Sequence, residues 1–125
     1  KHNLNDKLLS YINHKIDNYE YDIIIGQKDL ENWQIIDESD EFDLWFHIDN
    51  LPSSHVIIRQ HMKKGQDINY FNEIITLAAD YCKQNSKYKN KKNKIIYTNI
   101  GNLKKGKEVG SVLILNAKLV KNIFI

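Results

Sequence analysis

The stretch DLWFHIDNLPSSHVIIR, which spans residues 43–59, decides the fold of this chain. It holds two runs whose side chains alternate between two faces, as they do in paired β-strands. The segment LPSS between the runs predicts a turn, because proline fixes φ and serine side chains bond their own backbone. We expect the runs to pair as a hairpin, with a flat ring, two imidazoles and a guanidinium on one face: Trp45, His47, His55 and Arg59. Such a face is costly to build for packing alone, so it is a candidate for ligand binding.

Length and composition indicate one domain over residues 1–125. The 125 residues suit a single core, and 42% hydrophobic residues is ordinary for a globular protein. No apolar run approaches the length of a bilayer span and no N-terminal signal is visible, so we expect a cytoplasmic protein with no membrane partner. The single cysteine, Cys82, fits a reducing compartment, and its neighbours predict burial in a helix.

The remaining pattern mixes helices and strands without regular alternation. This predicts an α+β fold, a mostly antiparallel sheet with two or three packed helices. We expect an amphipathic N-terminal helix within residues 1–18, on the spacing of Leu4, Leu8, Ile12 and Ile16. The other expected elements are a strand over 21–25, a helix over 29–37 with Leu30, Trp33 and Ile36 inward and Asp29 as its N-cap, a helix over 67–83, a strand over 95–100, a glycine-punctuated loop over 101–110, and a hairpin joining 112–115 to 119–124.

Charge is unevenly distributed, although the net charge is only +2. Residues 17–50 contain eleven acidic residues and one lysine, whereas residues 83–107 contain nine lysines and no acidic residue. Once folded, this asymmetry predicts a positive face that attracts phosphate. The alternative is a solvated lysine-rich loop with no ligand.

The segments DLWFHI and PSSHVIIR also resemble the signature of the NFACT-R domain, an RNA-binding domain of ribosome-associated quality control proteins. The resemblance covers about residues 20–120, although Ser53 stands where many members have glycine. Weaker similarities along the chain are Gly26 followed by Asn32, the Ala78-Ala79 helix, Tyr97-Thr98, and Lys104-Lys105 followed by Gly110. The resemblance implies a role near translation, with tRNA or ribosomal RNA as ligand and the large ribosomal subunit as a candidate partner. DNA is a further candidate, because DNA sensing is attributed to small coiled-coil relatives.

Nucleic-acid binding needs cations for phosphates and planar side chains for stacking. With one arginine in the chain, we expect recognition of backbone and shape with little base specificity. Trp45 and Tyr97 are either stacking groups or core, and Arg59 either contacts the ligand or pairs with Asp43 or Asp49. The predicted nucleic-acid-binding residues are Trp45, His47, Ser54, His55, Arg59, Lys87, Lys89, Lys91, Lys92, Lys94, Tyr97, Lys104, Lys105 and Lys107.

Two other function classes stay open. His47 and His55 are weak catalytic candidates for an RNA-processing or RNA-modifying enzyme, as base and acid. A protein–protein adaptor would instead use the acidic segment 17–50 to hold a basic partner. No zinc-type spacing, Walker loop or GxGxxG motif is present, so we expect no metal and no cofactor. The sequence leaves the oligomeric state undetermined.

Overall fold

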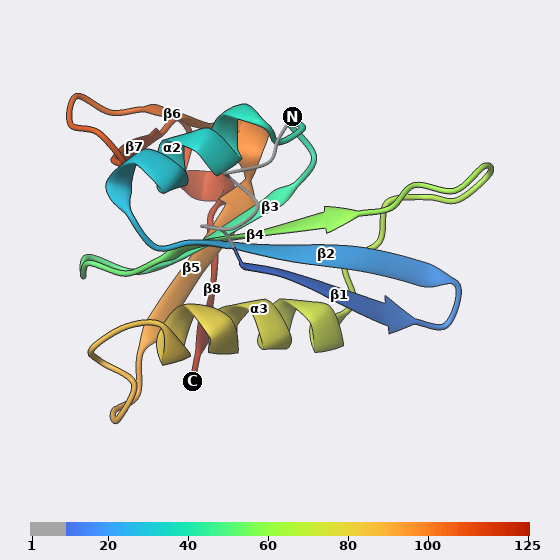
Figure 1. Cartoon of the computed structure of the whole chain (residues 1–125), viewed down its shortest axis with the longest axis horizontal. Helices are drawn as coiled ribbons and strands as arrows, with labels where there is room; N and C mark the ends of the chain where they lie inside the picture. The colour runs from blue at the N-terminus through green and yellow to red at the C-terminus, as the bar shows by residue number, and fades with distance from the viewer. Residues whose placement is uncertain (1–9) are drawn as a thin grey trace.

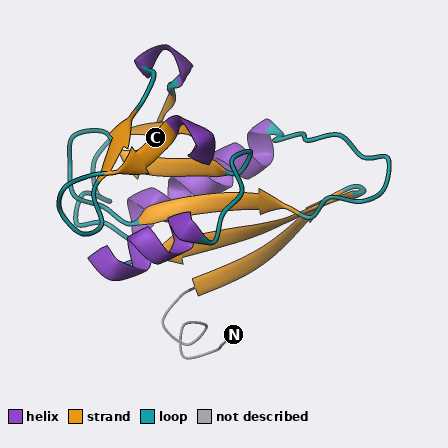
Figure 2. Ribbon diagram, turned by 90° about the horizontal axis from the view of Figure 1, so that it is seen from above, coloured by secondary structure: helices purple, strands orange, loops and turns teal. Residues whose placement is uncertain are grey.

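The computed structural model describes residues 10–125 as a six-stranded antiparallel sheet with one helix on each face (Figure 1). The strand order is β1-β2-β4-β3-β5-β8, and every neighbouring pair is antiparallel. Figure 2 is seen from the α2 side, with α2 in front of the strands and α3 behind them. The expected α+β class is therefore confirmed.

The hairpin predicted from residues 43–59 lies at the centre of this sheet. Strands β3 (Leu44–Ile48) and β4 (His55–Gln60) pair antiparallel, with Trp45 opposite Ile57. This register places Trp45 and His47 on the same face as His55, because alternate residues share a face. Strand β2 (Tyr19–Gly26) pairs with the other edge of β4 and places Gly26 opposite His55.

The expected N-terminal helix is wrong for residues 10–16, and residues 1–9 lie outside the part that the structure describes. Strand β1 (Ser10–Ile16) pairs with β2 along its whole length. Ile12 and Ile16 are four residues apart, a spacing that shares one face in a helix and also in a strand. Both pack on the α3 side of the sheet, so the sequence pattern itself did not distinguish the two structures.

Helix α2 (Asp29–Asp37) has the predicted bounds, but the predicted cap at Asp29 is wrong, and of the predicted inward residues only Ile36 packs on the buried cluster around Ile35 and Trp45. Leu30 is 70% exposed, whereas Asn32 and Ile35 face the sheet. The N-cap is Lys28, and the buried Glu31 carboxylate accepts hydrogen bonds from the backbone N–H groups of Gln27 and Lys28. These hydrogen bonds hold Glu31 against the loop that precedes the helix. The face of α2 that contains Asn32 and Ile35 is therefore turned toward the sheet, and Leu30 points to solvent.

Helix α3 (Asn72–Gln84) covers the opposite face of the sheet and begins five residues later than the predicted start at residue 67. Its buried side packs on the larger apolar cluster, which includes Phe46, Val56 and Ile95. Cys82 is fully buried within this cluster, as predicted. Burial raises the pKa of its thiol to about 11, which makes it a poor nucleophile.

The expected hairpin between residues 112–115 and 119–124 is wrong. Strand β5 (Lys94–Asn99) carries β8 (Lys121–Phe124) on its free edge, whereas β7 (Val112–Ile114) pairs with β6 (Leu103–Lys105) in a separate two-stranded sheet. Short 3-10 turns at Ile100–Asn102 and Ala117–Leu119 redirect the chain. Asn102 holds this arrangement together, because its side chain bonds both the N–H and the C=O of Asn116.

Three loops gather at one end of the sheet, on the left of Figure 1, and we call this the loop end. They are the β3–β4 turn (residues 49–54), the α3–β5 loop (residues 85–93) and the β6–β7 loop (residues 106–111). The turn contacts the end of α3, where the Cys82 thiol donates to Ser54 O and the Ser54 hydroxyl donates to Asn85 O, each at 3.5 Å. The opposite end carries the β1–β2 turn and the loop over residues 61–71, which are joined where His61 N donates to Glu20 O.

Candidate nucleic-acid interface

A cluster of one indole and two imidazoles forms on the α2 face of the hairpin, at the loop end. Trp45 Nε1 donates to His55 Nδ1 over 2.9 Å, and both side chains are almost fully buried. The His47 ring stacks on Trp45, with ring centroids 5.6 Å apart and planes 9° apart. The His47 and His55 rings meet edge to face at 5.1 Å. The structure therefore brings together the three ring-bearing side chains that the sequence placed on one face.

The protonation of both imidazoles follows from these contacts. Because the indole N–H only donates, His55 Nδ1 must accept, and the proton of the neutral ring sits on Nε2. Burial, with a smaller contribution from the neighbouring His47, lowers the pKa of His55 to about 3. His47 Nδ1 lies 2.6 Å from Ile48 O, which only accepts, so Nδ1 carries the proton and Nε2 offers a lone pair. Burial also lowers the pKa of His47, so both rings are neutral at neutral pH.

These assignments weaken the expectation of acid–base catalysis. A general acid needs a proton to give near the working pH, and the lowered pKa of His55 denies it one. Arg59, expected either to contact the ligand or to pair with Asp43 or Asp49, lies away from the imidazoles. The Arg59 guanidinium donates from Nε to Asp43 Oδ2 over 3.2 Å and from Nη2 to Glu38 O over 3.0 Å. Arg59 thus forms the structural ion pair that was its alternative role, at the far end of β4 from His55.

The ring cluster forms one wall of a pocket of about 560 Å³. The β3–β4 turn, the first turn of α2 and the segment from Glu108 to Ile114 form the other walls. Lining residues with polar or charged side chains include Asp29, Asn32, His47, Asp49, His55 and Glu108. The pocket therefore combines a predicted ring cluster with elements that the sequence did not connect to it.

Asn32 is a site residue that the sequence analysis did not predict. It is 5% exposed, lines the pocket, and has the one enclosed side-chain oxygen without a hydrogen-bond partner among the described residues. Its Oδ1 lies directly over Gly26, where an added Cβ would come within 2.6 Å of it. The sequence did contain a signal for this residue. Gly26 followed by Asn32 is one of the weaker similarities to the family, but no role was assigned to it.

Gly110 holds the loop wall of the pocket against α2. Its φ is +90°, and an added Cβ would lie 2.8 Å from Asp29 Cα. We expect Gly110→Ala to lower the free energy of unfolding by about 2–3 kcal/mol, because the backbone strain and the clash with α2 add. Urea unfolding monitored by circular dichroism measures this loss.

Gly65→Ala is the matched control for that change. Gly65 has a similar φ of +77°, but no heavy atom lies within 4 Å of its added Cβ. This control should cost only the strain of the left-handed conformation, about 1 kcal/mol. Equal losses for the two variants would show that the contact of Gly110 with α2 adds nothing to stability.

The predicted lysines are all exposed, and the structure divides them between the loop end and the side of α2. Lys87 and Lys91 lie 5.7 and 5.2 Å from the centre of the Tyr88 ring, in the α3–β5 loop that also holds Lys89 and Lys92. Lys94 pairs with Asp49 at 3.6 Å, which ties the basic segment to the β3–β4 turn. The basic α3–β5 loop therefore lies at the same end of the sheet as the ring cluster, toward the α3 face, whereas the cluster faces α2.

The lysines near β6 are placed differently. Lys105 pairs with Asp37 at 2.8 Å and lies over the Trp33 ring, alongside α2. Lys104 precedes it in β6, and Lys107 lies in the β6–β7 loop next to the pocket residue Glu108. Of these three lysines, Lys107 is therefore the one that lies at the loop end.

Two other predicted residues are not part of the pocket wall. Tyr97 stacks on Phe46 at 5.0 Å, on the α3 face of the sheet and so on the opposite side from Trp45. Ser54 is buried and bonds the end of α3. Ser53, in contrast, lines the pocket, and its hydroxyl accepts a hydrogen bond from Ile48 N, which closes the turn.

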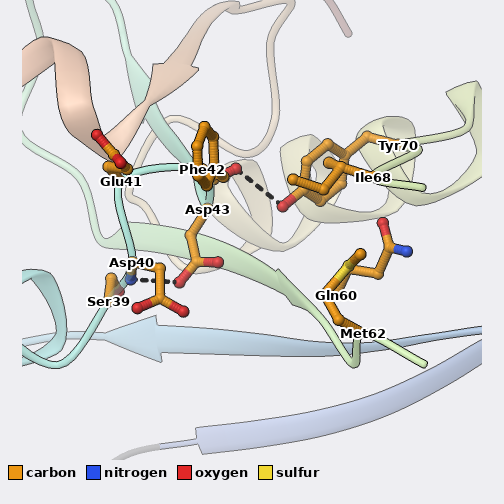
Figure 3. Close-up of a pocket in the computed structure, with 9 residues that line it drawn as sticks. All are labelled: Ser39, Asp40, Glu41, Phe42, Asp43, Gln60, Met62, Ile68 and Tyr70. Atoms are coloured by element: carbon orange, nitrogen blue, oxygen red, sulfur yellow. Dashed lines mark hydrogen bonds between the residues drawn. The ribbon is translucent and has the colours of Figure 1, made fainter. Parts of the chain in front are cut away.

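A second hollow, of about 540 Å³, lies at the other end of the β3–β4 pair (Figure 3). Tyr70 donates from its hydroxyl to Phe42 O across it, and the carboxylate of Asp43 accepts from Asp40 N. Its rim carries exposed Asp40 and Glu41 beside exposed Phe42, so it repels phosphate. The expected docking of a basic partner on the acidic segment would use this hollow, and that alternative stays a prediction.

Across residues 10–125, no group of three or more His, Cys, Asp or Glu side chains is arranged to hold a metal ion. Within the same range, no helix is both long and apolar enough to cross a membrane.

A small antiparallel α+β domain with a basic loop end and an aromatic-walled pocket has the features of a nucleic-acid-binding module. The family described as NFACT protein RNA binding domain matches residues 7–116. Because this match covers most of the chain, the protein belongs to that family, as the resemblance of the central hairpin predicted.

Relatives in other organisms support this membership. The chain is 38% identical over 88 residues to coiled-coil domain-containing protein 25 of Bos taurus, covering 68% of this chain and 41% of the relative. It is 36% identical over 107 residues to the Dictyostelium discoideum homologue of that protein, covering 82% of this chain and 51% of the relative. The chain therefore spans about half the length, or less, of these relatives.

A solved structure shares the fold. The C-terminal part of the fibronectin/fibrinogen-binding protein from Streptococcus suis superimposes with a TM-score of 0.70 at 22% identity. The similarity covers 84% of this chain and 41% of the other. At this identity the match supports the architecture alone.

Proposed function

We propose that this domain binds RNA through its loop end, and that the RNA is tRNA or ribosomal RNA, as on the large ribosomal subunit. The observation that supports this most directly is the position of the α3–β5 loop. Its four lysines carry no carboxylate partner among the described residues, and they lie at the same end of the sheet as the ring cluster. Unpaired surface lysines at the same end of the domain as a pocket with an aromatic wall would supply the two contacts that RNA recognition needs.

The basic loop is also held in place, which favours a specific surface over a merely solvated loop. Asn93 is buried and donates from its amide to Tyr88 O and Lys91 O, so it closes the loop from inside. Its backbone exchanges two hydrogen bonds with Ile125. Lysines on an ordered backbone lose less entropy when they meet phosphates.

The salt dependence of binding tests this function. We expect the affinity for tRNA and for single-stranded RNA to fall by about a hundredfold between about 50 and 200 mM salt, as for some five phosphate contacts. Fluorescence anisotropy with a labelled RNA measures the affinity at each salt concentration. A DNA oligonucleotide of the same sequence tests whether the domain prefers RNA to DNA. A flat salt response would show that the lysines make no phosphate contacts and would refute the proposal.

A further inference from the structure

Resting on the proposed function, we infer that the pocket behind the loop end takes one unstacked nucleobase of the bound RNA. We propose that the base carries an exocyclic amino group, as adenine and cytosine do. Asn32, His47 and His55 would contact its edge, while the neighbouring lysines hold the flanking phosphates.

The first argument is the unused hydrogen-bonding capacity of Asn32. Asn32 is 5% exposed, and its Oδ1 is enclosed without a hydrogen-bond partner within residues 10–125. An enclosed carboxamide oxygen without a partner costs stability, so a fold has no structural reason to keep one. Its terminal torsion is broad, so the group can turn either its oxygen or its amino face to a ligand in the pocket.

The second argument is the fixed polarity of the two imidazoles. His55 presents an Nε2–H donor because Trp45 occupies its Nδ1, and His47 presents an Nε2 lone pair because Ile48 O occupies its Nδ1–H. A ligand edge with one acceptor next to one donor complements this pair. Adenine and cytosine form such an edge with a ring nitrogen and an amino group, and uracil and guanine form one with a carbonyl and a ring N–H, so the choice among bases rests on the carboxylates described next.

The third argument is the charge distribution around the pocket. Three carboxylates line it: Asp29, Asp49 and Glu108. Lys94 pairs with Asp49, and Lys28 and Lys107 are the chain neighbours of Asp29 and Glu108. Carboxylates repel phosphate and carbonyl oxygens but accept hydrogen bonds from amino groups, so the pocket disfavours uracil and the lysines outside it suit phosphate.

The fourth argument is size. A volume of about 560 Å³ lies within the range of pockets that hold small organic ligands. The His47 ring, stacked on the buried indole of Trp45, forms an aromatic surface of the pocket, and bases pulled out of a strand stack on such surfaces. This arrangement revises the expectation of recognition by backbone and shape alone.

The test compares short single-stranded oligoadenylate, oligocytidylate and oligouridylate of equal length. We expect the first two to bind at least about tenfold more tightly than the third in fluorescence anisotropy. Asn32→Leu, which has a similar shape, should remove this preference and leave oligouridylate binding unchanged. Because the replaced Oδ1 has no partner within residues 10–125, the variant should also melt at a temperature no lower than the wild type.

Asn72→Leu makes the same chemical change at an exposed position that begins α3, and it should keep the preference. A readout without any variant is the indole N–H resonance of Trp45, which should shift on adding oligoadenylate and not on adding oligouridylate. Equal affinities for the three oligonucleotides, or a preference that survives Asn32→Leu, would overturn the inference of a base pocket. Salt-dependent RNA binding in the same experiments would still support the proposed function. Failure of every RNA to bind would overturn both.

Discussion

Reversing three lysines of the α3–β5 loop should abolish most RNA binding. The triple change Lys87→Glu, Lys89→Glu and Lys92→Glu is expected to weaken binding at about 0.1 M salt by at least about a hundredfold. Each reversal removes a phosphate contact and adds a repulsive charge. The slope of log affinity against log salt concentration should fall by about 2, since each lost contact on a single strand contributes about 0.7.

The matched control reverses three lysines at the opposite end of the sheet. Lys15, Lys63 and Lys64 are exposed like the lysines of the loop, and Lys63 bonds Asn18 O in the β1–β2 turn. Both triple variants change the net charge equally, so a purely global attraction would weaken binding equally. We expect the control to stay within about threefold of the wild type, because charges beyond a Debye length are screened. Equal losses in the two triple variants would show that the loop end is not the binding surface.

Acid should destabilise the protein steeply through His55. Its folded-state pKa of about 3 lies below the ordinary value of 6.5, so the unfolded chain binds a proton that the folded chain refuses. The stability contribution is complete above the unfolded pKa and is lost as pH falls toward the folded pKa. We expect His55 to remove about 1.4 kcal/mol of stability for each pH unit between about pH 6 and pH 4.

The comparison that isolates this effect is His55→Asn. The asparagine oxygen takes the place of Nδ1, so Trp45 Nε1 keeps an acceptor, but the residue no longer titrates. Chemical unfolding at a series of pH values gives both stability curves, and carboxylates common to both proteins cancel in their difference. Parallel curves between pH 6 and 4 would mean that the imidazole is protonated in the folded state and that the neutral ring cluster is wrong.

The two predictions concern two different parts of the candidate site, the charged lysines and the neutral ring cluster. A cationic His55 would repel the nearby lysines and bind phosphate, whereas a neutral one donates a single N–H in a fixed direction. Under the proposed function, two tasks are divided between groups of residues at the loop end. Exposed lysines supply charge, and buried rings supply shape and hydrogen-bond polarity.

Local pattern in the sequence was sufficient for the central hairpin and for its ring-bearing face. Alternation over residues 44–48 and 55–59 fixes which side chains share a face, because the period of a strand is two. The bounds of α2 and the burial of Cys82 followed in the same way from short-range spacing and composition. The same local reasoning failed for β1, because residues four apart share a face in both a helix and a strand.

Tertiary structure alone decided the rest of the site. Asn32 and Gly110 lie far from the hairpin in sequence and reach the pocket only because α2 and the β6–β7 loop close over β2 and β4. Arg59 shares the face of His55, yet a strand places residues four apart at opposite ends, and Asp43 holds the guanidinium there. Tertiary structure also decided that β8 pairs with the free edge of β5 and that β7 pairs with β6 in a separate sheet. The sequence therefore determined the face that carries the rings, because faces depend on local geometry, whereas the pocket depends on contacts between segments that only the folded chain brings together.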